Sequence, residues 1–369
     1  MSRINAHYRV RSTAEAIAAR AKGIAVEQSV EMPLEAIDNA RILSDIVGRV
    51  DDITDLGDGL FDVHIGLAVE TTGLEAGQLL NMLFGNTSIH DDVVLWDAEF
   101  PDEVLAAFGG PRHGIAGLRA RVSVDDRALT CSALKPQGLP SADLAELSGA
   151  FAAGGVDYIK DDHGLADQAY CRFAERVPAC AQAVRREGGG RTRYAPSLSG
   201  HLGQLRDQVQ IARNEGLDTL LIAPMVVGLA TFHAIVAESP DMAFMVHPAM
   251  TGNARITPPF LFGRLLRLMG GDAAIFTNYG GRFAFNPETC RDLAAAALAP
   301  WRSIKAAVPV PAGGMTLDRV PEMIEFYGTD VMLLIGGDLL RAGKNLTAAT
   351  ATFVEAVAQR SRESADTKP

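Results

Sequence analysis

The chain has 369 residues, of which 48% are hydrophobic and 21% charged, and its net charge at pH 7 is −11. This length exceeds one average domain and suits one large domain with a smaller one. The negative charge argues against nucleic acid or an anionic membrane as a partner, because both would repel it.

The N-terminus and the cysteines indicate the compartment. The chain begins MSRINAHYRV, without an apolar signal region, and no stretch approaches the roughly 18 apolar residues that span a bilayer. Its four cysteines form no CxxC pair and show no metal-ligand spacing. We therefore expect a soluble, cytoplasmic protein with reduced thiols.

Residues 1–127 mix helical and strand patterns, which predicts a small N-terminal α+β domain. An alanine-rich helix is expected over Thr13–Lys22, between a capping serine and a glycine. Asp62–Val69 alternates and then becomes apolar, as a sheet strand does, and Asp58–Gly59 is typical of a hairpin turn.

Residues 128–369 alternate short apolar runs with helix-length segments. Such alternation implies parallel strands, and eight units are the number in a closed (β/α)8 TIM barrel; an open doubly wound sheet is the alternative on rhythm alone. The polar tail, Ser361–Pro369, is expected to fray from a C-terminal helical tail. The expected strands are Thr130–Lys135, Asp157–Asp162, Tyr194–Ser199, Thr219–Ala223, Ala243–His247, Ala274–Asn278, Val308–Ala312 and Val331–Ile335, and expected helices include Asp143–Ala153, Gln168–Arg186 and Leu202–Asn214.

Catalytic groups of such a barrel lie at the carboxyl ends of its strands. The first run ends in Lys135, whose amine can act as acid or base when partly desolvated. In the second, strand alternation puts Lys160 and Asp162 on one side, with His163 where the chain leaves the barrel. A carboxylate suits Mg²⁺, and a buried neutral lysine can take up CO2 as an anionic carbamate. A Lys–Asp ion pair is the structural alternative.

The later strand ends predict a phosphate site. His247 ends the fifth run and can serve as acid, base or phosphate donor. Arg282, in the glycine-rich segment after the sixth run, can cover an anion. Paired glycines after the last two runs let backbone N–H groups approach a phosphate closely. These pairs are Gly313 with Gly314 and Gly336 with Gly337.

Together these motifs resemble the RuBisCO superfamily over nearly the whole chain. GGVDYIKDDH is similar to the family's second-strand motif, which implies a carbamate on Lys160 and Asp162 as a Mg²⁺ ligand. LKPQG and VHPAM resemble the motifs that give Lys135 and His247 catalytic roles. The resemblance also implies at least a homodimer, in which N-terminal residues of one subunit complete the site of another. IAVEQSVEMP and NMLFGN carry these residues, Glu27 and Asn86.

Departures from the family pattern predict that the chain does not fix CO2. The strand-6 loop reads NYGGRF and lacks the lysine that holds CO2, and the strand-1 motif is shortened around Gln137. Pro248 replaces the arginine after the strand-5 histidine. His163 replaces the second metal carboxylate; it can ligate a softer ion, bind through water or act as a base.

What remains is machinery for removing a proton next to a carbonyl: a metal, a base and a phosphate anchor. The resemblance favours a RuBisCO-like isomerase of methionine salvage that converts 5-methylthioribulose 1-phosphate to 1-methylthioxylulose 5-phosphate. Alternatives are a 2,3-diketo-5-methylthiopentyl-1-phosphate enolase, a related enzyme acting on a sugar-acid phosphate, and a non-catalytic binding or regulatory barrel.

Overall fold

The computed structural model describes residues 2–281 and 285–366. The chain divides into two compact units, Met1–Gly109 with Met250–Leu261 and Gly110–Ala249 with Phe262–Pro369, and each is described by itself. The second unit thus begins earlier than the boundary expected at residue 127. It includes α4 (Gly114–Val122), which buries Leu118 and Val122 in the core of this unit.

The first unit is built on an antiparallel sheet in the order β2-β3-β1-β4. Along β1 every second side chain is buried, which places one face of the sheet against apolar side chains. The strands are β1 (Arg3–Arg11), β2 (Arg49–Asp55), β3 (Leu60–Ala68) and β4 (Val93–Glu99). The helices are α1 (Ile17–Glu27), α2 (Ala76–Phe84), α3 (Asp102–Phe108) and α10 (Pro258–Phe260).

The hairpin expected in this unit is confirmed, whereas its first helix differs from the expectation. β2 pairs with β3, and Asp58 and Gly59 between them have positive φ. The helix begins four residues late and passes through Gly23 to Glu27. It continues because Ile24 and Ala25 extend the buried face, and this burial outweighs the roughly 0.5–1 kcal/mol that a glycine costs inside a helix.

Among its described residues, the second unit contains the eight expected parallel strands, which confirms the barrel. Two ladders, β13-β5-β6-β7 and β8-β9-β10-β11-β12, account for its strands, and β12 also contacts β13. The third expected strand is interrupted at Pro196, which has no N–H to donate to a ladder. The strands are β5 (Leu129–Leu134), β6 (Tyr158–Asp161), β7 (Arg193–Ala195), β8 (Ser197–Leu198), β9 (Thr219–Ile222), β10 (Ala243–Val246), β11 (Ala273–Thr277), β12 (Val308–Ala312) and β13 (Met332–Leu334).

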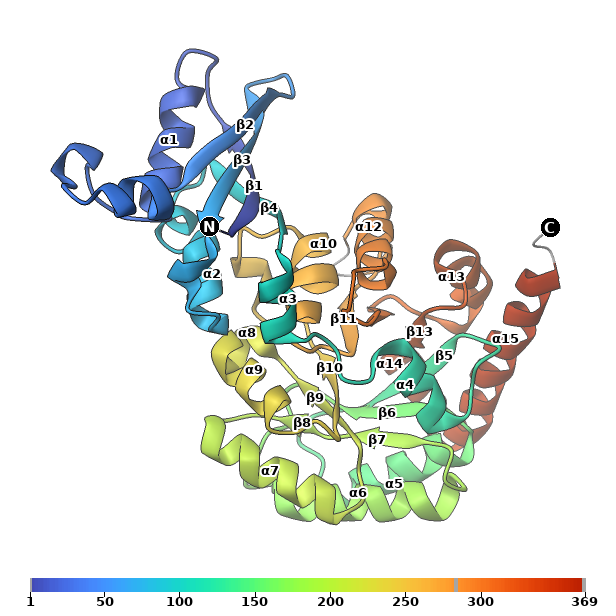
Figure 1. The fold of residues 1–369 in the computed structure, drawn as a ribbon. Helices are drawn as coiled ribbons and strands as arrows, with labels where there is room; N and C mark the ends of the chain where they lie inside the picture. Colours follow the sequence, from blue (N-terminus) through green and yellow to red (C-terminus); the bar gives the residue numbers. More distant parts are fainter. Residues whose placement is uncertain (1, 282–284, 367–369) are drawn as a thin grey trace. The chain divides into compact units, whose positions relative to one another are not determined.

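Helices surround these strands, with α5, α6 and α7 lying outside β6 and β7 (Figure 1). Gln168 and Cys171 form a bridge, so α6 begins after it rather than at Gln168 as expected. The helices are α5 (Ser141–Ala153), α6 (Phe173–Glu187), α7 (Leu202–Asn214), α8 (Pro224–Val227), α9 (Leu229–Ala237), α11 (Leu266–Leu268), α12 (Pro287–Leu298), α13 (Val320–Tyr327), α14 (Gly337–Leu340) and α15 (Leu346–Asp366).

The C-terminal helix corrects a second expectation. The polar tail was expected to fray from Ser361, but α15 continues to Asp366. Ser361 is fully buried, and its hydroxyl accepts a hydrogen bond from the N–H of Ala128, beside the start of β5. This long-range contact holds the helix end, which local polarity does not reveal. Among residues 2–281 and 285–366, no helix is long and apolar enough to cross a membrane.

The barrel interior has an apolar end and a polar end. Side chains at the strand starts, including Leu129, Ala243 and Val308, pack with Leu118 and Val122 of α4 in one core cluster. This packing fills the end where the strands begin. The opposite end, where the strands finish, is left for chemistry.

Candidate active site

A cavity of about 720 Å³ opens at the carboxyl ends of the barrel strands. Most residues singled out in the barrel sequence meet here, although they are spread over some 200 residues of chain. The lining includes Lys135, Lys160, Asp162, His163, His247, Gly313, Gly314, Gly336 and Gly337. Arg282 lies outside the described residues.

Lys160 is the most deeply buried cation of the cavity, with 4% of its surface exposed. Its ammonium donates to the carbonyl of Asp161 at 2.8 Å. Burial lowers the pKa of Lys160 below its ordinary value, because the charged form loses hydration. A larger fraction of the amine is therefore neutral, which is the form that reacts with carbon electrophiles such as CO2.

Asp162 is the anionic centre of the polar groups. The Nζ atom of Lys135 lies 2.6 Å from its Oδ2, and the N–H of Gly164 donates to Oδ1 at 2.9 Å. Burial opposes ionisation, but these hydrogen bonds outweigh it and hold the pKa of Asp162 far below its usual range. Gln137 also donates to Oδ1, at 3.3 Å. Asp162 is thus a fixed carboxylate with its lone pairs aimed at the cavity residues.

Asp161, between these two residues, points the other way. Its carboxylate is fully buried and accepts from Arg176 at 3.1 Å, Tyr194 at 2.7 Å and the N–H of Ser197 at 3.0 Å. Strand alternation explains this division, since neighbouring side chains leave a strand on opposite faces. The ion pair between Asp161 and Arg176 holds β6 on the face opposite the cavity, and Lys160 lines the cavity.

Two histidines from different strands stack beside the carboxylate. The rings of His163 and His247 lie 4.1 Å apart and nearly parallel, and His163 Nδ1 is 3.3 Å from Asp162 Oδ1. Burial and the nearby Lys160 charge lower the pKa of His247 to about 2. The N–H of Ala249 donates to its Nδ1 at 3.1 Å, which assigns the proton of the neutral ring to Nε2. His247 is therefore neutral at pH 7, with an Nε2–H available to donate a hydrogen bond.

The other side of the cavity is made of glycine backbone. Gly313 and Gly314 have φ values of 83° and 65°, which side-chain residues rarely adopt. Gly336 and Gly337 precede and begin α14, and a Cβ on Gly337 would meet nothing within 4 Å. Such exposed backbone, beside Arg341 in the lining, offers N–H groups and a positive charge to an anion.

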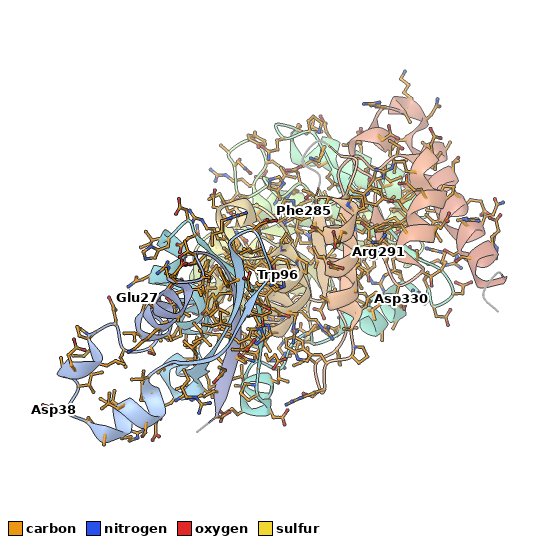
Figure 2. All side chains as sticks on the ribbon, turned by 90° about the horizontal axis from the view of Figure 1, so that it is seen from above. Glu27, Asp38, Trp96, Phe285, Arg291 and Asp330 are labelled. Carbon is orange, nitrogen blue, oxygen red and sulfur yellow. The ribbon has the colours of Figure 1, made fainter. Side chains whose placement is uncertain are left out.

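Glu27 and Asn86 belong to the first unit, where they contact each other. The amide of Asn86 donates to Glu27 at 2.8 Å and to Glu31 at 3.2 Å. Glu27 ends α1 and is labelled in Figure 2. Gln28, 2% exposed, accepts from the N–H of Thr87 and so joins the two segments. The structure brings these two predicted residues together across 59 positions of sequence.

The donor set fits a metal ion only in part. In the described chain, residues 2–281 and 285–366, no three His, Cys, Asp or Glu side chains are arranged to hold one. Asp162 supplies oxygen and His163 nitrogen, which leaves a set short of the oxygen ligands that Mg²⁺ prefers. A carbamate on Lys160 would add an oxygen donor. The residues present therefore fit a divalent ion together with a carbamate.

Several site residues escaped sequence reasoning. Gln137 was noted for the shortened motif but not for its bond to Asp162, and Glu31 was not considered beside Glu27. Arg319 contacts two cavity loops, although it lies in a short turn, Leu317–Arg319, five residues after Gly314. No local pattern marks these residues, since their roles depend on partners distant in sequence.

Comparisons with known proteins place this geometry in a family. The model for the catalytic domain of the ribulose bisphosphate carboxylase large chain matches residues 114–362. The chain is 60% identical over 360 residues to the 5-methylthioribulose-1-phosphate isomerase of Rhodospirillum rubrum, with 96% of each chain covered. It is 36% identical to the 2,3-diketo-5-methylthiopentyl-1-phosphate enolase of Geobacillus kaustophilus, over 71% of this chain and 66% of that enzyme.

A solved structure agrees with these matches. The crystal structure of a RuBisCO-like protein from Rhodopseudomonas palustris is similar to this fold with a TM-score of 0.91 and 51% sequence identity. The match covers 97% of this chain and 98% of that one. The expected fold is therefore confirmed over both units.

Proposed function

Because the chain belongs to the ribulose bisphosphate carboxylase large-chain family, we propose that it is a RuBisCO-like isomerase that does not fix CO2. It converts 5-methylthioribulose 1-phosphate to 1-methylthioxylulose 5-phosphate by a 1,3-proton transfer through cis-enediol intermediates. The 60% identity to an enzyme of that name supports the choice of substrate. The carrying observation is that Lys135 contacts Asp162, with the buried Lys160 in the lining of the same cavity, whose opposite side is glycine backbone.

Lys135 is the proposed proton shuttle. Its Nζ reaches the cavity while contacting Asp162, and 44% of the side chain is exposed. A group that takes a proton from one carbon and returns it to another needs this access. If Asp162 held a divalent ion, the Lys135 side chain would be released from that carboxylate and could face the substrate.

His247 stabilises the enediol as a neutral donor. Its Nε2–H can donate to a substrate oxygen, and its low pKa keeps it from competing for the substrate's proton at neutral pH. A hydrogen bond to an oxygen that gains charge in the transition state lowers the barrier more than one to the ground state. His247 thus acts on the oxygen while Lys135 acts on carbon.

The glycine loops hold the phosphate in this proposal. Gly313, Gly314, Gly336 and Gly337 present backbone to the cavity, and Arg282 is proposed to contribute charge. Glu27 and Asn86 contribute to a neighbouring subunit's site, so that the cytoplasmic enzyme works as a homodimer or larger homo-oligomer.

A divalent ion, Mg²⁺ in the first instance, is the proposed cofactor. It would be held by Asp162, His163 and a carbamate on Lys160, and it would polarise the carbonyl whose neighbouring carbon is deprotonated. Lys160 suits the carbamate because its pKa is lowered by burial. The stacking of His163 on His247 orients the imidazole beside Asp162.

Proton exchange tests the proposal directly. Wild-type protein is incubated with 5-methylthioribulose 1-phosphate, Mg²⁺ and bicarbonate in D2O and followed by ¹H and ³¹P NMR. We expect 1-methylthioxylulose 5-phosphate with deuterium at carbon next to the carbonyl. Lys135→Met should abolish both, and the exposed Lys344→Met should retain both. Unchanged substrate without exchange contradicts the isomerase.

The enolase is the second candidate because named relatives carry that activity. The same protein is therefore given 2,3-diketo-5-methylthiopentyl 1-phosphate, and the enol is followed by its ultraviolet absorbance. Rapid enol formation without turnover of the ribulose phosphate would replace the isomerase by the enolase. No turnover or exchange with either compound would favour the alternatives of a sugar-acid phosphate substrate or a non-catalytic barrel.

A further inference from the structure

Arg319 joins two loops that follow neighbouring barrel strands. One nitrogen of its guanidinium, Nη1, donates to the carbonyl of Tyr279 at 3.0 Å and to that of Gly314 at 3.1 Å. Tyr279 follows β11 and Gly314 follows β12. A single cationic group therefore bridges the segment after the sixth barrel strand to the glycine pair after the seventh.

The same two segments touch through bare backbone. A Cβ on Gly281 would lie 2.8 Å from the carbonyl oxygen of Gly313, and one on Gly314 would lie 2.5 Å from the Cα of Gly281. Contacts this close leave no room for side chains. The distance between the two segments is therefore set by their backbones and by the group that holds them together. That group is Arg319.

Arg319 is itself fixed by two side chains. Its Nε and Nη2 donate to Glu322 at 2.9 and 3.1 Å, and the hydroxyl of Tyr279 donates to Glu322 at 2.7 Å. The guanidinium also lies over the Tyr279 ring, 5.0 Å from its centroid. Burial and Glu322 raise the pKa of Tyr279 to about 12, so its hydroxyl remains a donor at neutral pH.

The tyrosine is braced from its other side. The Phe326 ring of α13 lies 4.8 Å from the Tyr279 ring, and the guanidinium of Arg291 lies 4.9 Å from the Phe326 centroid. Arg291 projects from α12 and is labelled in Figure 2. Three elements, α12, α13 and the turn at Arg319, thus converge on the segment that begins at Tyr279.

We propose that Arg319, with Glu322 and Tyr279, is a positioning device that sets the phosphate affinity of the site by holding the Tyr279–Gly281 segment against Gly313–Gly314. This inference rests on the proposed function, because it takes the glycine pair as the phosphate site. Arg319 acts through the backbone of both loops and is not a catalytic residue. Its effect falls on substrate binding rather than on proton transfer.

The geometry requires arginine. The planar guanidinium presents donors in a fixed fork, two to the carboxylate and two to the carbonyls, which the single ammonium of lysine cannot reproduce. Arg319→Met should lower the phosphate affinity, and Arg319→Lys should therefore retain less than half of the affinity that Arg319→Met loses. Tyr279→Phe keeps the ring under the guanidinium and removes only the hydroxyl contact, so its effect should be the smallest.

The test combines hydrogen exchange with binding of inorganic phosphate measured by calorimetry. In Arg319→Met we expect amide exchange of the Tyr279–Gly281 peptide to rise, and phosphate affinity to fall about tenfold as the bridging hydrogen bonds are lost. KM for the sugar phosphate should rise with kcat within about twofold, since a change in binding alone leaves the chemical step intact. Arg206→Met is the matched control, because it removes a bidentate pair with Glu238 between surface helices.

The outcomes separate this inference from the proposed function. Unchanged exchange and phosphate affinity in Arg319→Met overturn the positioning role, as does faster exchange with unchanged affinity. A loss confined to kcat also overturns it. If wild-type protein binds no phosphate, the proposed phosphate site fails and the inference fails with it. If Arg319→Met does not fold, amide exchange and phosphate affinity are measured in Tyr279→Phe and Glu322→Gln instead. The same outcomes then support or overturn the positioning role.

Discussion

The two sides of the barrel cavity are built on different principles. The ends of β5, β6 and β10 form a polar side, lined by charged and aromatic side chains: Lys135, Lys160, Asp162, His163 and His247. The ends of β11, β12 and β13 form a glycine side, made of backbone at Gly280, Gly281, Gly313, Gly314, Gly336 and Gly337. On the polar side the functional groups are titratable side chains. On the glycine side they are backbone groups, which are accessible because side chains are absent.

This difference predicts how each side responds to mutation. A buried charge costs hydration, so replacing it can preserve or increase stability while removing chemistry. Replacing a glycine that has a left-handed conformation and packs against another backbone should lower stability, because an added Cβ must displace main chain. The polar side should therefore lose activity without unfolding, and parts of the glycine side should lose stability first.

The largest effect is expected on the polar side, for Lys160→Met. The variant removes the proposed carbamate, and kcat/KM should fall at least about 10³-fold, equivalent to about 4 kcal/mol of transition-state stabilisation. Its stability should equal or exceed that of the wild type, since the buried amine is replaced by an apolar chain of similar length. Steady-state kinetics and urea unfolding measure the two quantities. Activity within tenfold of wild type would contradict the role of Lys160.

On the glycine side, Gly314→Ala should lower stability by about 2–4 kcal/mol, through its φ of 65° and its contact with the Gly281 backbone. Gly216→Ala is the control, with a φ of 68° and nothing within 4 Å of its Cβ; it should cost only about 1 kcal/mol. Urea unfolding compares them. Equal losses would mean that the contact between the two loops contributes nothing.

Acid should weaken the polar side before the glycine side. His247 has a pKa of about 2 when folded, below its ordinary value of 6.5, so between these values the unfolded chain binds a proton that the folded chain does not. Stability from this group is full above about pH 6.5 and should fall by about 2 kcal/mol between pH 7 and 5. Urea unfolding of wild type and His247→Gln at both pH values tests this, and an equal slope in the variant would refute it.

The smallest effect is expected for Gly337→Ala. Its Cβ would enter open space in the cavity, so stability should change by less than about 0.5 kcal/mol while KM for the sugar phosphate rises about five- to tenfold. Gly252→Ala, which also meets nothing within 4 Å, should leave both unchanged. If KM does not rise, the phosphate does not approach Gly337.

Much of the barrel and part of the site could be predicted from local pattern. The eight apolar runs match the observed strands, and Lys160 and Asp162, expected on one side of their strand, both line the cavity. Residues at the carboxyl ends of parallel strands gather at one end of a barrel wherever they lie in sequence. The two glycine pairs were found by the same rule.

The errors have a common cause. The end predicted for α1 at Gly23 and the fraying predicted from Ser361 both followed local signals, a glycine and a polar tail. The structure overrides each one through packing: Ile24 extends a buried face, and Ser361 bonds to Ala128. Local propensity is a weak prior, and tertiary contacts decide such boundaries.

The sequence by itself determined the barrel, the shared face of Lys160 and Asp162 and the kinds of group at the strand ends, because these depend on periods of two and 3.6 residues. Only the tertiary structure decided that Lys135 and Gln137 share Asp162, that His163 stacks on His247, and that one guanidinium joins the loops after β11 and β12. Those contacts join residues that are far apart in the sequence and are brought together by closure of the barrel. No local pattern encodes such contacts.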